Sequence, residues 1–498
     1  MEQNMVDEKE DFEELAVTDE AEEEGEDWPQ IVAILIGCFS SLTTGMLYTW
    51  PSPFILKIAE DDNYSISEDE AAHFSTIPSI SMMLFCPLSS KLCDIIGRRG
   101  TLLLSTIPYT LCWLLKVFAR NIYVFYLARF LAGVGDGIVI PSLAMYMGEI
   151  STPKVRGIWG NSMTASMYLG ELAITVIGNY FGVQQTSYIC APVILTFAVF
   201  FWFMPESPYF YIMEGRYQEA KNSLRIFRRK KKINKEFNEL KAAVERQISE
   251  SGTWRDLFLI ASNRRALIAG VFLRMSQLLG GSSVFIAYTM YIFKKSGGNV
   301  SSEASSIIYM TLCFFLNVCA SFTMDIMGRK IAYIASLLPC AVVLLLESVY
   351  FYVDKELPDV NVENFKWFPL AGMVMYIIFS SYGIGIVPSL MLGELFSASI
   401  KAKGICILTF VFGIMLFVSN YIFYVFHSAF GLFAPFLFFS VCNFVSAFLV
   451  YFLVPETKGK TLEEIQQDLK KGKLSSLKEL KPFLGEIKRT ESGGILSK

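Results

Sequence analysis

One short motif occurs twice in this chain, and the repetition limits what the chain can fold into. Asp94-Ile95-Ile96-Gly97-Arg98-Arg99 returns 231 residues later as Asp325-Ile326-Met327-Gly328-Arg329-Lys330, again between two apolar runs. Two further pairs follow in the same order. They are Glu149 with Arg156 against Glu394 with Lys401, and Pro205-Glu206-Ser207 against Pro455-Glu456-Thr457. Motifs that recur in one order at nearly the same offset indicate a duplicated half.

The composition places the duplicated halves in a membrane. Hydrophobic residues make up 53% of the 498 residues and charged residues only 18%. Apolar runs of about 20 residues recur, and each is long enough to cross the hydrocarbon core of a bilayer. We predict an all-α membrane protein with twelve spans. They cover about 29–50, 72–92, 100–118, 122–147, 157–181, 188–204, 265–293, 304–324, 331–353, 367–392, 404–426 and 430–454.

These spans predict five regions along the chain. Residues 1–28 form a tail in which positions 1–27 hold fourteen acids and only one base, Lys9, a composition typical of disorder. The two six-helix bundles cover 29–204 and 265–454. A basic connector, 205–264, joins them and is expected to form short surface helices, and 455–498 is a second tail. No signal peptide precedes the first apolar run, so we predict a retained span there.

The distribution of basic residues predicts the orientation. Arg98, Arg156, Arg329, Lys401 and the connector all fall on one side of a twelve-span chain, which should be cytoplasmic together with both termini. The two N-x-[ST] sequons, at Asn63 and Asn299, fall on the opposite side and are candidate glycosylation sites. We therefore expect a cell-surface location.

Several classes of function find no support in the residues. The ten cysteines lie almost all in apolar runs without a C-x-x-C pair, and the two histidines are far apart. We therefore expect no disulfide framework, metal site or cofactor. The sequence contains neither a nucleophile–base pair nor a phosphate-binding loop, so nothing in it predicts an enzyme. The basic run at 228–232 lies beside a bilayer and is better interpreted as a topology signal or a lipid contact than as a nucleic-acid site.

The repeated motifs predict a network of charges that gates the protein. Gly97 and Gly328 permit tight turns between spans, which place acids and bases at helix ends where they can pair with each other or with helix dipoles. Such a network on one face of a two-half protein is expected to act as a latch between the halves. Its predicted members are Asp94, Arg98, Arg99, Glu149, Arg156, Glu206, Asp325, Arg329, Glu394, Lys401 and Glu456.

Over residues 29 to about 466 the chain resembles the sugar porters of the major facilitator superfamily. The resemblance rests on the motifs above, on Arg129 with Gly133-Val134-Gly135-Asp136-Gly137, and on Pro455 to Ile465. Gly45 to Pro53 is similar to insect-type facilitated trehalose and glucose transporters. The resemblance implies the major facilitator fold: two pseudo-symmetric bundles that rock around a central substrate site. It also implies that the charge network stabilises the outward-open form.

The chain departs from the family at the positions that bind sugar. Thr164 and Ser276 replace glutamines, Ser282 replaces an asparagine, and Ser389 replaces a tryptophan. Phe412 and Gly413 replace an asparagine-tryptophan pair, and Tyr209 replaces an arginine. Phe412, Ile286 and Ala287 make the predicted cavity more apolar. Each buried sugar hydroxyl left unpaired costs about 1–3 kcal/mol. The predicted substrate-binding residues are Gln277, Thr164, Ser282, Glu171, Ser276 and Ser389.

Two ionisable residues in spans add to this site. Glu171 shares a helical face with Thr164 and Tyr168, and Arg274 shares one with Gln277. Charged groups in a span usually face a cavity or a partner. One hypothesis is that Glu171 binds substrate hydroxyls or a cation with Arg274 as its counter-charge. The alternative is that Glu171 snorkels outward and Arg274 reaches the cytoplasmic interface. Asp136 is similarly open, and close helix packing explains its flanking glycines best.

The predicted function is facilitated diffusion of a sugar or polyol through alternating access. Residues 31–50 contain no acid, unlike the first span of proton-linked relatives, although Glu171 leaves proton coupling open. Two alternatives remain: a non-transporting sensor, and a carrier of a different small molecule. The expected partners are the small-molecule substrate and the lipid bilayer, and we expect a monomer to suffice.

Overall fold

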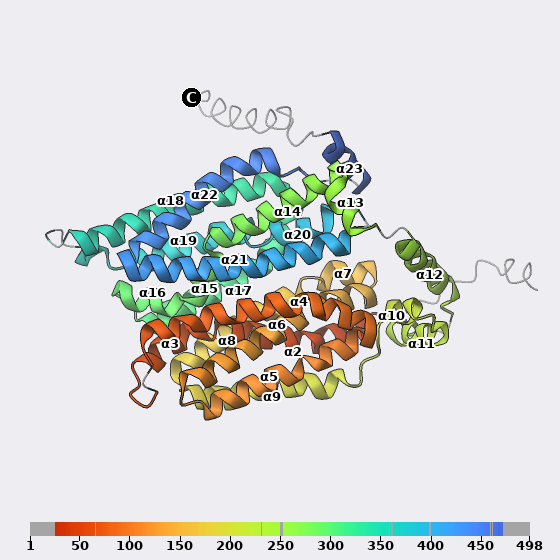
Figure 1. The fold of residues 1–498 in the computed structure, drawn as a ribbon, viewed down its shortest axis with the longest axis horizontal. Helices are drawn as coiled ribbons and strands as arrows, with labels where there is room; N and C mark the ends of the chain where they lie inside the picture. Colours follow the sequence, from red (N-terminus) through yellow and green to blue (C-terminus); the bar gives the residue numbers. More distant parts are fainter. Residues whose placement is uncertain are drawn as a thin grey trace, which may run out of the picture.

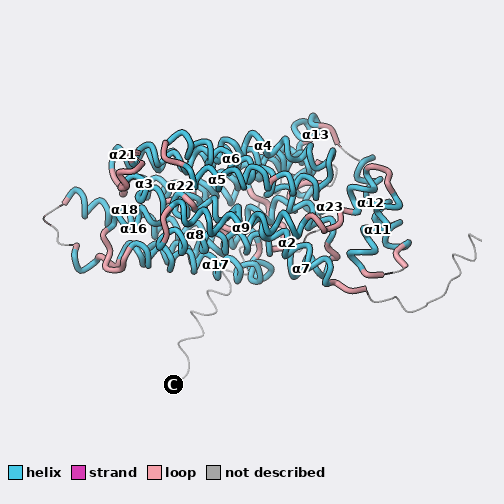
Figure 2. Tube along the Cα trace, turned by 90° about the horizontal axis from the view of Figure 1, so that it is seen from below, coloured by secondary structure: helices cyan, strands magenta, loops and turns pink. Residues whose placement is uncertain are grey.

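The computed structural model describes residues 25–471, except 65, 231, 250–251, 358, 360–361, 398–399, 459 and 461. In this part of the chain, helices are the only extended secondary structure (Figure 2). The predicted tail at 1–28 lies outside the described residues up to position 24, as does the second tail beyond 471.

The first half contains eight helices that lie together in the lower part of Figure 1. They are α2 (Trp28–Thr49), α3 (Pro51–Ala59), α4 (Glu68–Leu104), α5 (Thr106–Phe118), α6 (Ile122–Ile150), α7 (Pro153–Trp159), α8 (Ser162–Tyr180) and α9 (Val183–Phe201).

Four short helices form the connector. They are α10 (Pro208–Met213), α11 (Tyr217–Arg228), α12 (Asn234–Ser249) and α13 (Trp254–Leu259). The surface helices predicted here are confirmed: Phe237 and Val244 of α12 join Ile212 and Leu224 in a small apolar core of their own. Helices α10, α11 and α12 therefore share a core of their own, whereas Leu257 of α13 joins the main core of the bundles.

The second half lies in the upper part of Figure 1. It comprises α14 (Ala261–Leu279), α15 (Ser282–Ala287), α16 (Thr289–Ser296), α17 (Ser302–Met327), α18 (Arg329–Glu356), the 3-10 turn η1 (Glu363–Phe365), α19 (Phe368–Tyr382), α20 (Val387–Glu394), α21 (Lys401–Phe430), α22 (Phe433–Leu453) and α23 (Leu462–Lys471).

The helix boundaries follow from local sequence. Ser67 caps α4 and Glu70 bonds back to it, a capping box that fixes the helix start. Asn121 accepts a hydrogen bond from Tyr123 N at 2.9 Å and begins α6. Gly281 adopts φ +94°, a conformation that favours glycine, and there the seventh predicted span breaks between α14 and α15.

Every predicted span is helical, but its suitability for a membrane varies. Ten stretches of the described residues are long and apolar enough to cross a bilayer. The second and third predicted spans share one of them, Asp69–Phe118, and α8 is not among them. α8 carries polar side chains along the face that meets the other half, which lowers its mean hydropathy.

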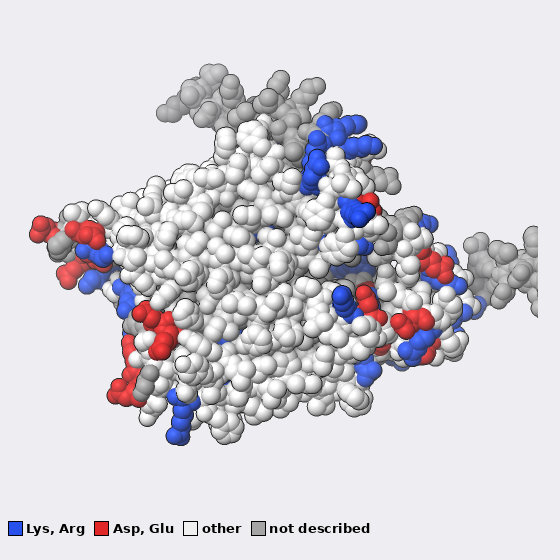
Figure 3. Space-filling view, viewed as in Figure 1, with Lys and Arg blue, Asp and Glu red and all other residues white. Residues whose placement is uncertain are grey.

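The two ends of the bundle differ, and we name them. The sequon end holds the loops with Asn63 and Asn299 (left in Figure 1), and the motif end holds Gly97, Gly328 and the connector (right). Charged side chains gather at both ends, and the broad surface between them is nearly uncharged in Figure 3. An apolar belt of this kind is what a lipid bilayer surrounds.

Glycines allow the helices inside each half to approach closely. A Cβ added at Gly45 of α2 would lie 1.9 Å from the Met167 carbonyl oxygen of α8, and one at Gly170 would lie 2.1 Å from the Leu42 carbonyl oxygen. Cβ atoms at Gly133 and Gly135 would likewise meet α4 and the Tyr109 ring at 2.1–2.2 Å. The packing role predicted for the glycines around Asp136 is confirmed.

Candidate functional site

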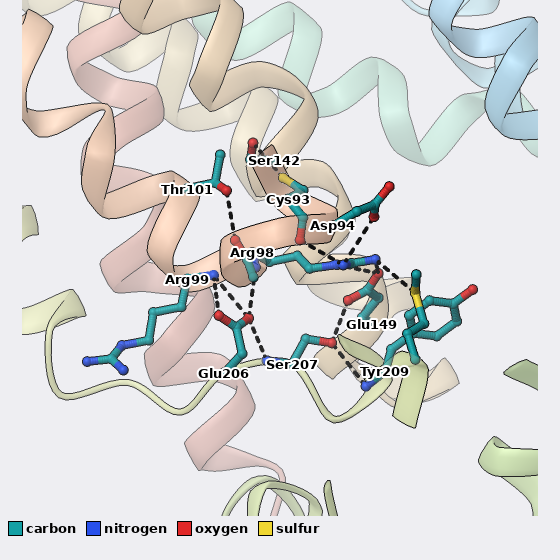
Figure 4. Close-up of polar contacts among 12 residues, drawn as sticks. Cys93, Asp94, Arg98, Arg99, Thr101, Ser142, Glu149, Glu206, Ser207 and Tyr209 are labelled. Carbon is teal, nitrogen blue, oxygen red and sulfur yellow. Dashed lines mark hydrogen bonds and ion pairs between the residues drawn. The ribbon is translucent and has the colours of Figure 1, made fainter. Parts of the chain in front are cut away.

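The turn at Gly97 builds a binding site for one carboxylate at the motif end. Gly97 adopts φ +84°, which turns the next two backbone N–H groups toward the connector. Arg98 N and Arg99 N each donate to the Glu206 carboxylate at 3.0 Å, and Ser207 N donates to it at 2.9 Å. Glu206 therefore fastens the start of the connector to the α4 turn (Figure 4).

The Arg98 side chain extends this cluster to α6. Its guanidinium binds Glu149 at 3.0 Å and the Cys93 carbonyl oxygen at 3.0 Å, and Asp94 lies at 3.5 Å. Glu149 also accepts from the Ser207 hydroxyl (Figure 4). Only 3% of Arg98 is exposed, so its charge depends on Glu149 for compensation.

Aromatic rings cover the same guanidinium. It lies 5.5 Å from the Tyr209 ring centroid and 5.7 Å from that of Phe210. Burial raises the pKa of the Tyr209 hydroxyl, so the phenol stays neutral and adds no charge beside Arg98.

The second half repeats the bonds that hold the two glutamates. Gly328 also adopts φ +84°. Arg329 N and Lys330 N donate to Glu456 at 3.0 Å, and Arg329 binds Glu394 at 3.1 Å. Thr457 donates to Glu394 as Ser207 does to Glu149. The duplication inferred from the motifs thus extends to individual hydrogen bonds.

Three predicted members of the network differ from this pattern. Arg156 does not pair with Glu149; it donates to the Gly148 and Ser151 carbonyl oxygens at the end of α6. Lys401 begins α21 and forms no ion pair with Glu394 within the described residues. Asp325 lies in α17, and its side chain is outside the described residues.

Among the described residues, the bonds named above each join residues of one half. Glu149, Glu206 and Arg98 belong to the first half and its connector, and Arg329, Glu394 and Glu456 belong to the second. These bonds therefore hold each half in shape. A latch between the halves stays a prediction.

Hydrogen bonds join the two halves at the sequon end. Lys294 of α16 binds Glu60 at 2.5 Å, and Met290 N donates to Ser52 Oγ at 3.2 Å. The Tyr288 hydroxyl donates to the Ala72 carbonyl oxygen at 3.2 Å. Asn179 of α8 donates to the Glu303 carbonyl oxygen and to Ser306 Oγ of α17, both at 3.2 Å.

One stripe of α8 faces the second half. Thr164, Tyr168, Glu171 and Asn179 follow one another at steps of a helical turn or two, and Asn179 bonds α17. Glu171 is 1% exposed and its Oε2 has no hydrogen-bond partner. Thr164, toward the motif end, is exposed. The Tyr309 hydroxyl, one turn along α17 from Ser306, is also buried without a partner.

The other predicted binding residues surround the break between α14 and α15. Arg274 donates to Gln277 Oε1 at 2.8 Å, and its guanidinium lies 5.0 Å from the Phe412 ring centroid. Ser282 Oγ bonds the Gln277 carbonyl oxygen, and Ser276 bonds the Tyr333 hydroxyl. Arg274 and Glu171 form no ion pair within the described residues, so the suggested counter-charge pairing is not present.

Two predicted residues stand apart from these groups. Ser389 lies in α20 and is exposed. Asp136 accepts a hydrogen bond from the Tyr109 hydroxyl at 2.7 Å, and that hydroxyl bonds Thr44 at 2.8 Å. Asp136 thereby links three helices inside the first half. Asn63 and Asn299 are both exposed in loops.

The family model for the sugar (and other) transporters matches residues 31–469, nearly the whole described chain. This chain belongs to the sugar transporter family. A facilitated trehalose transporter from Polypedilum vanderplanki is 30% identical to this sugar transporter over 466 residues, 92% of this chain and 91% of the relative. One from Drosophila yakuba is 29% identical over 464 residues, 92% of this chain but only 54% of the relative. This chain spans about half the length of such Drosophila relatives.

Solved structures agree on the fold of this sugar transporter. The inward-open xylose transporter XylE from E. coli superposes with a TM-score of 0.72 at 18% identity, covering 88% of this chain and 99% of that one. Its partially occluded inward-open form gives 0.71 at 16% identity, covering 87% and 99%. The twelve-helix fold predicted from the motifs is confirmed.

Sequence reasoning missed two buried charges of this sugar transporter. Glu347 of α18 is fully buried with both carboxylate oxygens unpartnered, close to Gly372 of α19. The Lys116 ammonium of α5 lies between the Trp50 and Trp113 rings, 4.1 and 4.5 Å from their centroids. A lone charge within a long apolar run was the available signal for both.

Proposed function

We propose that this protein carries a sugar, with trehalose as the first candidate, across a membrane by facilitated diffusion. The observation that supports it most is the seam between α8 and α17, where Glu171 and Tyr309 offer buried polar atoms without partners. Such atoms are costly unless a ligand or water satisfies them. The named trehalose transporters among the relatives favour the same substrate class.

The site is formed by both halves, as alternating access requires. Glu171 and Thr164 come from α8, Gln277 and Ser282 from the broken α14–α15 segment, and Tyr309 from α17. Arg274 donates a hydrogen bond to the Gln277 amide oxygen, which leaves the Gln277 amide NH₂ as the donor for a substrate oxygen. Substrate between the halves would be released as the ties at the sequon end open.

Facilitated diffusion fits the charges of the first span. Between Trp28 and Thr49, α2 contains no acid, so it offers no carboxylate to take up a proton with the substrate. We further propose that the motif end is cytoplasmic with both termini, that Asn63 and Asn299 are glycosylated outside the cell, and that a monomer without enzymatic activity suffices in the cell membrane.

The test is uptake by the purified full chain in liposomes, with labelled trehalose, glucose and a panel of polyols. Saturable, gradient-free flux of one sugar, lost in a Glu149→Ala variant, is the expected result. Accumulation driven by a proton gradient would reject facilitated diffusion. Binding without flux for any sugar would reject transport and favour the sensor, and flux of none of the sugars with no binding would reject a sugar substrate.

A further inference from the structure

The last residues of the acidic segment lie against the end of α11. Glu26 N donates to the Arg228 carbonyl oxygen at 3.1 Å, and Arg229 binds the Glu26 carboxylate at 3.3 Å. Asp27 binds Lys154 at 2.9 Å. A Cβ added at Gly25 would lie 2.5 Å from the Arg228 carbonyl oxygen and 2.6 Å from Lys230 Cε. The chain thus enters the fold directly over a basic turn.

The basic turn follows the end of α11, where the backbone adopts an unusual conformation. Arg229 adopts φ +49°, the only positive φ at a non-glycine among the described residues. L-residues adopt this conformation rarely, so the surroundings must stabilise it. It places the guanidinium 5.2 Å from the Trp28 ring centroid and beside Glu26.

A shallow hollow of about 700 Å³ lies next to this turn. Its lining residues are Trp28, Pro29, Arg225, Ile226, Arg229 and Lys230. Three of these lining residues are cations: Arg225, Arg229 and Lys230. The acid described beside them is Glu26, which bonds Arg229 and the Trp28 indole. The hollow therefore has unmatched positive charge and an apolar floor.

We propose that the acidic segment Asp19–Glu24 of this same chain docks in this basic hollow. The segment carries five acids in six residues and is joined through Gly25 to the edge of the hollow, so its effective concentration there is high. Its charge is complementary to that of Arg225, Arg229 and Lys230. Docking ties the start of α2 to the connector, as the Glu26 contacts already do.

Because Arg225 and Arg229 are exposed, each contact is individually weak and is screened by salt. The docked state is therefore expected to be reversible and to loosen when ionic strength rises. An anionic lipid headgroup carries similar charge and is the competing occupant of the same hollow.

Zero-length cross-linking with a carbodiimide tests the proposal, because this reagent joins a carboxylate only to an amine in contact with it. The full chain is reconstituted in nanodiscs of neutral phosphatidylcholine, cross-linked and sequenced by mass spectrometry. We expect amides between Asp19–Glu24 and Lys230, reduced about five-fold or more by roughly 0.5 M NaCl, as screening requires. The Arg225→Gln/Arg229→Gln variant should reduce them similarly while Lys230 remains available.

The matched control is Arg246→Gln/Arg255→Gln, which removes two connector charges outside the hollow and should leave the cross-links unchanged. Tail carboxylates joined evenly to lysines throughout the connector, or not joined at all, would overturn the proposal. Protection of Lys230 from acetylation by phosphatidylserine nanodiscs, without tail cross-links in neutral ones, would assign the hollow to lipid instead.

Discussion

At the scale of single residues, the two turn glycines have one backbone conformation but different surroundings. Gly97 and Gly328 both adopt φ +84°. A Cβ at Gly97 would lie 2.2 Å from Glu206 Oε2, whereas one at Gly328 would lie 3.2 Å from Glu456 Oε2. The first site therefore leaves no room for a side chain, and the second leaves a little.

We predict that Gly97→Ala destabilises the protein more than Gly328→Ala does. Both variants incur the cost of a positive-φ, extended-ψ backbone that almost only glycine adopts, about 1–3 kcal/mol, and Gly97→Ala also displaces the Glu206 carboxylate from two N–H donors. Thermal unfolding in detergent measures the difference. Gly215→Ala is the control for a positive φ without steric contact, because Gly215 adopts φ +73° with nothing within 4 Å of an added Cβ. Equal losses in all three variants would contradict the role assigned to Glu206.

A second prediction concerns Glu171 and Glu347, the two buried glutamates that have carboxylate oxygens without a hydrogen-bond partner. Glu171→Gln keeps the side-chain volume but removes the charge and exchanges one acceptor oxygen for an NH₂ donor, so transport kcat/KM should fall about ten-fold, the effect of one buried hydrogen bond to a charged group. The control is Glu347→Gln, which is equally buried but packs between α18 and α19 inside one half. Transport lost equally in both variants, or in neither, would remove Glu171 from the substrate site.

At the scale of elements, the short helix α16 provides several of the bonds that close the sequon end. It is only eight residues long, yet Met290 and Lys294 both bond the first half, and Tyr288 immediately precedes it. α8 and α17 add the Asn179 bonds. These few polar contacts are what must break when this end opens.

We predict that Tyr288→Phe/Asn179→Ala opens the sequon end more often. Ala72→Cys serves as the reporter, because residue 72 is buried beneath Tyr288 and bonds it only through its backbone carbonyl. Its labelling by an impermeant maleimide, located by mass spectrometry, should rise several-fold. Tyr352→Phe/Asn63→Ala changes an exposed tyrosine and a loop asparagine at the same end. A rise in this control equal to that of the test variant would refute the prediction.

At the scale of the whole molecule, the repeated clusters are two copies of one clamp. Each joins a turn between two spans to the segment that leaves its own bundle, through Glu206 in one half and Glu456 in the other. Since the two copies share no residue, we expect each to contribute to the free energy of unfolding independently of the other.

We therefore predict that Glu149→Gln and Glu394→Gln act independently. Each should destabilise by about 1–3 kcal/mol by leaving an arginine poorly paired, with the larger loss at Glu149 because Arg98 is the more buried arginine. Distant sites without shared partners add to within about 0.5 kcal/mol. A double-mutant cycle on unfolding free energy measures this. A coupling well above that value would show that the clusters meet, as the latch hypothesis requires.

The sequence by itself determined the duplication, the helical membrane fold and the two turn glycines, because those depend on patterns that are local or repeated. It also placed Arg98, Glu149 and Glu206 in one network from their motifs. Only the tertiary structure decided the partners. Arg156 bonds helix-end carbonyls and not Glu149, and Arg274 bonds Gln277, lies over the Phe412 ring and does not pair with Glu171. Long flexible side chains reach several neighbours, so which one they bind depends on how helices distant in sequence pack together.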